Sequence, residues 1–200
     1  TVDRDSGDKR SWAYKHQGDL TELPQLAGLP KLRSLIASSI LLSDIRALTD
    51  LPAFTHLYLE SPYGRRGDIQ DTPVDLSALS RLPGLEYVKV DAIRPVVGVS
   101  TLGDCAKLRV LDIGNARGPT ELGWGAESPA LKTLQACSLH KVSDLTHISE
   151  LANTPRLLQV KLTGADLLTE LSPLAGLMQN PRASLLWGAQ KYTGEALQGL

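Results

Sequence analysis

The stretch TELPQLAGLPKLRSLIA, residues 21–37, predicts the fold of this chain. Its first half is helix-like, and its second half, LPKLRSLIA, is strand-like. The first half returns as TELSPLAGL at residues 169–177, where seven of the nine positions are identical. A unit that returns so far along the chain indicates internal repetition.

The pattern LxxLxL from the second half of that stretch recurs along the whole chain. Successive copies begin 22, 31, 23, 23, 26 and 26 residues apart. The copies are Leu32-Leu35-Ala37, Phe54-Leu57-Leu59, Leu85-Val88-Val90, Leu108-Leu111-Ile113, Leu131-Leu134-Ala136, Leu157-Val160-Leu162 and Ala183-Leu186-Gly188. A basic unit of 22 or 23 residues with insertions accounts for these spacings.

Each copy combines a strand with a short helix. The L-x-L part alternates, as expected for a strand with one buried face. Apolar residues at helical spacing follow each strand, and prolines then end most of these segments. Because helices of two or three turns are too short to be stable alone, they must pack on their neighbours. A strand, a turn and a short helix repeated in this way predict a parallel solenoid.

This pattern resembles the leucine-rich repeat family, in the class with repeats of about 22 residues. The resemblance covers roughly residues 19–200 and implies about seven to eight repeats, with residues 1–18 as an N-terminal cap or linker. It implies an α/β fold with a curved parallel sheet on the concave side and short helices and loops on the convex side. The phrases LSDIRALTDLP and LSPLAGL also resemble arrays in actinobacterial proteins that follow a NACHT-type ATPase.

The overall composition limits the classes of partner and the cellular compartment that the sequence favours. The net charge is −1, and 22% of residues are charged, which favours neither nucleic acid nor an anionic membrane. Two cysteines do not make a disulfide framework, and no apolar run reaches membrane-spanning length. The polar N-terminus lacks Met and a signal-peptide core, which predicts a cytoplasmic protein and a piece or processed form of a longer chain.

The sequence contains no recognisable catalytic or cofactor-binding motif. It has no phosphate-binding glycine loop, no HExxH and no GxSxG, and no histidine pair has metal-ligand spacing near a cysteine. His140 and His147 are expected on a solvated turn and helix. Cys137 is expected on the exposed strand face, as an ordinary or a reactive thiol. We therefore predict no enzyme activity, no cofactor and no metal.

The concave face is the predicted binding surface. Side chains alternate across a strand, so the residues between and beside the buried leucines point outward. The candidates are Ile36, His56, Tyr58, Glu60, Tyr87, Lys89, Asp91, Asp112, Gln135, Gln159, Lys161 and Trp187. Aromatic side chains among mixed charges favour a protein or peptide over nucleic acid, which requires a basic stripe. Tyr63, Arg65 and Arg66 in the insertion at residues 61–74 form a second candidate contact.

These features favour a protein-binding scaffold. The more specific hypothesis is the ligand-sensing C-terminal domain of a bacterial NLR-like defence or regulatory protein. One alternative is a stand-alone regulatory subunit that docks on an enzyme such as a phosphatase. The other is an effector enzyme that uses Cys137. The sequence leaves the oligomeric state open.

Overall fold

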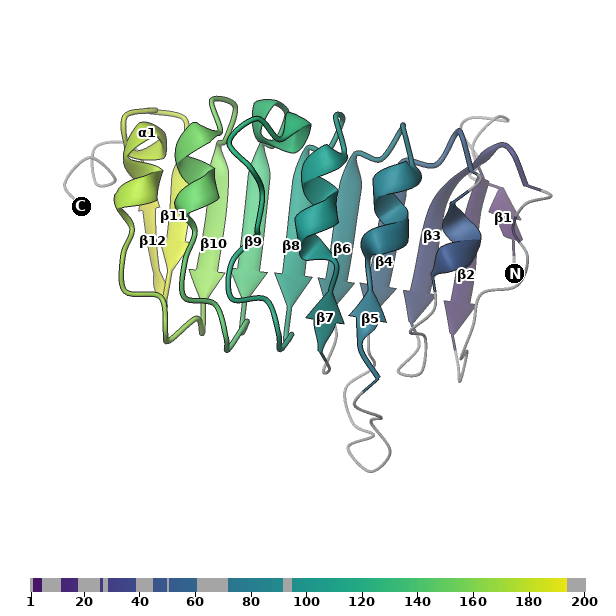
Figure 1. The fold of residues 1–200 in the computed structure, drawn as a ribbon, viewed down its shortest axis with the longest axis horizontal. Helices are drawn as coiled ribbons and strands as arrows, with labels where there is room; N and C mark the ends of the chain where they lie inside the picture. The colour runs from purple at the N-terminus through teal and green to yellow at the C-terminus, as the bar shows by residue number, and fades with distance from the viewer. Residues whose placement is uncertain are drawn as a thin grey trace.

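A long parallel sheet forms one layer of the computed structural model, and short turns form the other (Figure 1). The structure describes residues 2–4, 12–17, 26, 29–38, 45–49, 51–60, 72–91 and 95–193. Tyr63, Arg65 and Arg66 lie outside the described residues.

In the described part of the chain, the main sheet has ten strands in the order β1-β2-β3-β4-β6-β8-β9-β10-β11-β12. Its strands are β1 (Val2–Arg4), β2 (Trp12–Gln17), β3 (Leu32–Ser38), β4 (His56–Glu60), β6 (Tyr87–Asp91), β8 (Val110–Gly114), β9 (Ala136–His140), β10 (Gln159–Thr163), β11 (Ser184–Trp187) and β12 (Gln190–Thr193). From β2 to β11 all neighbours are parallel, whereas β1-β2 and β11-β12 are antiparallel pairs at the two ends. The expected repeat strands are therefore confirmed as one parallel sheet, and residues 2–4 and 12–17 extend it at the N-terminal end.

The second layer consists almost entirely of 3-10 turns, where the sequence predicted short helices. They are η1 (Arg46–Leu48), η2 (Ser77–Arg81), η3 (Val99–Asp104), η4 (Pro129–Lys132), η5 (Ser149–Asn153) and η6 (Ser172–Leu174), which continues into the short α-helix α1 (Ala175–Met178). A 3-10 helix has three residues per turn, so apolar residues spaced by three all face one side. Leu76, Leu79 and Leu82 follow this spacing around η2, and all three are buried. The leucine spacing thus matches the tighter turn.

Two short strands add a second, minor sheet beside the turns. β5 (Val74–Asp75) pairs in parallel with β7 (Val96–Val97), and an isolated bridge joins Pro95 to Arg117 in the next repeat. Asp75 also caps the turn that follows, because its Oδ1 accepts a hydrogen bond from the Ser77 amide at 2.9 Å.

The core lies between the sheet and the turns and is continuous along the repeats. Leu35, Leu57, Val88 and Leu111 stand at the same position in adjacent strands and are fully buried. Each repeat buries its apolar face only against its neighbours, as expected for a solenoid.

The glycine-rich insertion after β8, residues 116–128, is a largely exposed loop that is anchored in the core through Leu122 and Trp124. Trp124 from this insertion is 5% exposed, and its Nε1 donates a hydrogen bond to the Val99 carbonyl at 3.0 Å. Glu150 Oε1 accepts a hydrogen bond from the Gly123 amide at 2.7 Å, so η5 holds the loop from the following repeat. The insertion is therefore attached to η3 and η5, the turns of the neighbouring repeats.

Candidate functional site

The face of the sheet opposite the turns carries the predicted binding residues. We call it the open face; it is the side that the sequence predicts to be concave. On each strand, alternate residues are buried beneath this face, and the residues between them are half-buried or exposed on it. Its middle row, read from strand to strand through the parallel pairing, is Ile36, Tyr58, Lys89, Asp112, Ser138, Lys161 and Leu186.

The pairing places most of the predicted residues on the open face. His56, Tyr87 and Gln159 lie in the row toward the strand starts, and Glu60 and Asp91 lie in the row toward the strand ends. The exceptions are Gln135 and Trp187, whose predicted positions are wrong.

Gln135 is misplaced because the fifth repeat is shifted by three residues. The residue that matches Leu108 is Leu134, not Leu131, so the strand that pairs with β8 is Ala136–His140. Gln135 therefore lies before β9, at the edge of the sheet. Cys137 pairs with Leu111 and is 1% exposed, so the prediction of an exposed thiol was also wrong.

Trp187 is misplaced by a single residue. It pairs with the buried Leu162, so it belongs to the core-facing series of β11, although its position near the end of the sheet leaves it 36% exposed. Leu186 takes its place in the middle row of the open face. A slip of one residue reverses the two faces of a strand.

The N-terminal half of the open face carries an aromatic cluster, which we define as His56, Tyr58 and Tyr87. The rings of Tyr58 and Tyr87 are stacked with centroids 4.7 Å apart, and His56 lies 5.7 Å from Tyr87 and 6.4 Å from Tyr58. All three side chains are half-buried, and Ile36 pairs with Tyr58 on the adjacent strand. The cluster therefore presents a contiguous apolar and aromatic area with polar tips.

An ion pair borders this cluster. Lys89 Nζ lies 2.6 Å from Glu60 Oε1, and this hydrogen bond raises the pKa of the Lys89 ammonium. Partial burial raises the pKa of the Tyr87 phenol, and the neighbouring Tyr58 adds to the increase. Both side chains therefore keep their protons at neutral pH, and Tyr87 keeps a hydrogen-bond donor for a ligand.

His140, expected on a solvated turn, lies instead at the end of β9 on the open face. Its ring covers Gly114 on the adjacent strand, and its side chain is 16% exposed. Nδ1 lies 3.5 Å from Asp112 Oδ1, and Nε2 lies 3.8 Å from Asp91 Oδ2, while Asn115 Nδ2 donates a hydrogen bond to Asp91 at 2.6 Å. Within the described ranges, no group of three or more His, Cys, Asp or Glu side chains is arranged to hold a metal ion.

A shallow pocket of about 260 Å³ lies on the C-terminal half of the open face. Lys161 and Lys191 line it together with Asp112, Ser138 and Leu186. Sequence reasoning missed Ser138 and Leu186 because both follow from the corrected register of β9 and β11.

Both thiols are in the core and unsuited to covalent catalysis. Burial raises the pKa of Cys105 and of Cys137 to about 12. Asp104 adds to the increase at Cys105, and Asp112 and Glu150 add to it at Cys137. Because the thiolate is the nucleophilic form, this environment disfavours the hypothesis of an effector enzyme that uses Cys137.

The helical segments in the described part of the chain are all too short to cross a bilayer. No sequence profile of a protein family matches the chain, and no curated protein matches it by sequence.

Solved structures supply the comparison. The chain is similar to the internalin inlF of Listeria monocytogenes str. 4b F2365, with 24% identity and a TM-score of 0.53 over 82% of this chain and 43% of that one. It is similar to internalin C2 (inlC2) of the same strain, with 21% identity and a TM-score of 0.52 over 84% of this chain and 76% of that one.

A third similar structure is TLR13 in its complex with ssRNA13, with 18% identity and a TM-score of 0.50 over 85% of this chain and 25% of that one. The present chain thus spans less than half of the inlF structure and a quarter of the TLR13 structure. At these identities the likeness concerns the fold, and together with the parallel sheet and its repeating turns it identifies the chain as a leucine-rich repeat solenoid.

Proposed function

We propose that this chain is a protein-binding scaffold that holds a peptide or protein segment on the aromatic cluster of its open face. The observation that carries this proposal is the stacking of His56, Tyr58 and Tyr87 on a face that no other element of the described chain covers. Tyrosine is among the residues that contribute most binding energy at protein interfaces, and stacked rings lose little further freedom when a ligand binds.

The charges around the cluster support a protein ligand over nucleic acid. The middle row contains both signs of charge, Lys89, Asp112 and Lys161, and Glu60 and Asp91 border it. Binding to a phosphate backbone requires several cations in a line, and these carboxylates would oppose it. Polar side chains of both signs around an apolar centre are instead typical of protein interfaces.

A library of displayed random dodecapeptides, selected on the immobilised wild-type protein, provides a test that needs no known partner. We expect the selected peptides to lose about 30-fold in affinity on the double variant Tyr58→Ala/Tyr87→Ala, because truncation of an interface hot spot costs about 2 kcal/mol or more. Arg81→Ala, on the exposed side of η2, is the matched control and is expected to change the affinity less than about twofold.

Thermal unfolding must first show that the double variant remains folded. Peptides that bind the folded double variant as tightly as the wild type would contradict the assignment of the aromatic cluster.

A more specific form of the proposal makes the array the ligand-sensing domain of a bacterial, cytoplasmic NLR-like protein. Its support is the likeness of LSDIRALTDLP and LSPLAGL to arrays behind NACHT-type ATPases. In this form the array has no catalytic activity, and a ligand on the open face would release the linked ATPase. Sequencing the gene upstream of the codon for Thr1 tests it: an upstream reading frame without a nucleotide-binding loop would exclude it.

A further inference from the structure

A second surface lies at the edge of the sheet where the strands begin. We call it the strand-start edge. Exposed cations gather there in spite of the net charge of −1. These cations are Lys31, Arg33, Lys107, Arg109, Lys132, Arg156 and Arg182. Five of the strands thus begin near at least one cation, and the positive charge is concentrated from β8 to β11.

A backbone ladder fixes the side chains of this edge in register. The Arg109 amide donates a hydrogen bond to the Glu86 carbonyl at 2.8 Å, and the Gln135 amide donates one to the Arg109 carbonyl at 2.8 Å. The same bonds continue from Thr55 to Glu86 and from Gln135 to Leu158. Because each residue is tied to its equivalent in the next repeat, neighbouring side chains on this edge lie about 4.8 Å apart.

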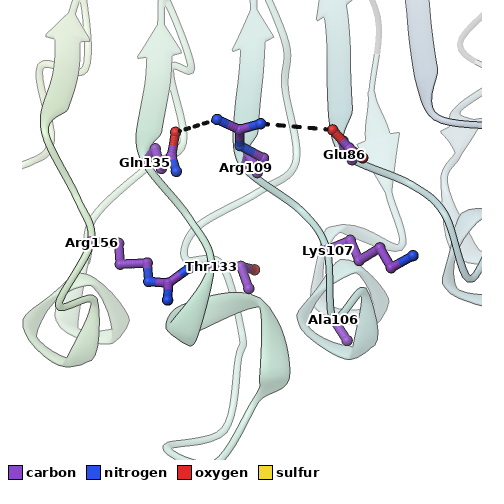
Figure 2. A pocket seen from close by; sticks show the side chains of 7 residues that line it. All are labelled: Glu86, Ala106, Lys107, Arg109, Thr133, Gln135 and Arg156. Atoms are coloured by element: carbon purple, nitrogen blue, oxygen red, sulfur yellow. Dashed lines mark hydrogen bonds and ion pairs between the residues drawn. The ribbon is translucent and has the colours of Figure 1, made fainter.

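The ladder builds a pocket of about 310 Å³ between β6 and β10, shown in Figure 2. Its charged lining is Lys107, Arg109 and Arg156 against Glu86. The Arg109 guanidinium is held from both sides: Nη2 donates a hydrogen bond to Gln135 Oε1 at 3.0 Å, and Nη1 lies 3.9 Å from Glu86 Oε2 (Figure 2). The pocket therefore has a preorganised guanidinium with further donors available.

The other two cations of the pocket remain available to a ligand. Within the part of the chain that the structure describes, Lys107 and Arg156 make no ion pair or hydrogen bond. Figure 2 shows the Arg156 guanidinium turned toward Thr133, inside the pocket, and the Lys107 amine directed away from it. Two guanidinium groups thus flank the pocket, from β8 and from β10.

We propose that this strand-start pocket binds an acidic peptide segment through Arg109 and Arg156. Their strands are two positions apart in the sheet, so about 10 Å separates the two residues across the strands, and Arg156 also lies two residues before Leu158, the ladder equivalent of Arg109. Carboxylates three residues apart in an extended peptide are also about 10 Å apart, because each residue adds about 3.3 Å. The pocket therefore fits a Glu-x-x-Glu or Asp-x-x-Glu segment that crosses the strand starts. Guanidinium groups are the donors best matched to carboxylates.

Nucleic acid fits this pocket less well. Proteins that bind single strands combine cations with aromatic rings on which the bases stack, and the pocket lining contains no aromatic side chain. The aromatic cluster lies on the other, open face. The strand-start pocket is thus a site separate from the aromatic cluster, and neither proposal depends on the other.

Fluorescence anisotropy with a labelled dodecapeptide tests the site. The probe carries two Glu-x-x-Glu pairs with Val and Thr between them, and its control carries Gln in place of Glu. At about 25 mM NaCl we expect the Gln peptide to bind at least about tenfold more weakly, and about 150 mM NaCl to weaken the Glu peptide. R156Q is expected to weaken the Glu peptide about threefold and R109Q/R156Q about tenfold.

Two controls distinguish binding at this site from non-specific electrostatic attraction and from binding at the open face. K132Q removes a cation that lies 3.9 Å from Glu127 outside the pocket, and it is expected to change binding less than about twofold. Tyr58→Ala/Tyr87→Ala is expected to leave the Glu peptide unaffected.

Three results would overturn the proposal. They are equal binding of the Gln peptide, unchanged binding by folded R109Q/R156Q, and a twelve-nucleotide oligothymidylate that binds this pocket more tightly than the Glu peptide.

Discussion

The two buried thiols predict an unusual loss of stability at alkaline pH. Cys105 and Cys137 are 3% and 1% exposed, and burial raises the pKa of both thiols from 9.0 to about 12. Well below pH 9 both thiols are protonated in the folded and in the unfolded chain, so the contribution of the buried, protonated thiols to the free energy of unfolding is fully present. Above pH 9 the unfolded chain loses its thiol protons while the folded chain retains them up to about pH 12. The free energy of unfolding must therefore fall as the pH rises through this window.

The size of the effect follows from the two pKa values. Between pH 8 and pH 10.5, a thiol with pKa 9.0 in the unfolded chain and about 12 in the folded chain removes about 2 kcal/mol of stability. Two such thiols remove about 4 kcal/mol, a large part of the 5–15 kcal/mol typical of a domain. Lysines and tyrosines also titrate in this range, so the wild-type loss must be compared with that of C105A/C137A.

Urea unfolding followed by circular dichroism at pH 8 and pH 10.5 measures both proteins. We expect the wild type to lose about 4 kcal/mol more than C105A/C137A, whatever the variant costs at pH 8. Equal losses would refute the burial argument.

Native protein is also expected to react with a disulfide reagent about a thousandfold more slowly than a free thiol at pH 8, because its thiolate fraction is about a thousandfold smaller. Reaction of one thiol per chain with the reagent within seconds would contradict the expected slow reaction and would support the hypothesis of a reactive Cys137.

Two further substitutions probe packing on either side of the sheet. Gly114→Ala would place a methyl group inside the His140 ring and is expected to cost about 1–2 kcal/mol in urea unfolding, whereas Gly176→Ala, with open space around it, is expected to cost nothing. Addition of His140→Ala to Gly114→Ala should recover most of that cost, and simple additivity of the two changes would contradict the contact. Trp124→Phe leaves the buried Val99 carbonyl without its donor and should lower the free energy of unfolding by about 1–3 kcal/mol; an unchanged urea midpoint would argue against the buried hydrogen bond.

The leucine pattern was sufficient to predict the parallel sheet and the register of most strands. Where LxxLxL is unambiguous, as in Leu108-Leu111-Ile113, the structure pairs the strands as the pattern predicts. It failed in the fifth repeat because Leu131 and Leu134 are both buried and lie three residues apart, so the pattern fits either one. The correct choice needs Cys137 to occupy a leucine position, which a small apolar thiol does readily.

The seventh repeat was ambiguous for a different reason. Leu185, Leu186 and Trp187 form an unbroken apolar run, which contains no alternation to show which residue faces the core. Only the pairing of Leu185 with Val160 settles it. The two wrong site residues, Gln135 and Trp187, both follow from these ambiguities in register.

Contacts between side chains on neighbouring strands could not be predicted from the sequence for a more general reason. His140 covers Gly114, 26 residues earlier, and this contact becomes visible only when Gly114 and His140 are paired. The basic strand-start edge was likewise hidden, because a net charge of −1 averages over the whole chain while the ladder gathers cations on one edge. The features that distinguish one solenoid from another thus depend on register, which is the property that repeats define least well.

The same ladder places the two proposed surfaces next to each other. Glu86 and Tyr87 are consecutive, yet Glu86 faces the strand-start pocket and Tyr87 the aromatic cluster. An extended segment that leaves the cluster toward the strand starts would therefore reach Arg109 on the next strand. If one peptide occupies both surfaces, Tyr87→Ala and Arg156→Gln should each weaken its binding, whereas a peptide that occupies one surface should respond to only one of the two substitutions. Measurement of both single variants with each peptide selected by the wild-type protein therefore distinguishes one continuous interface from two independent ones.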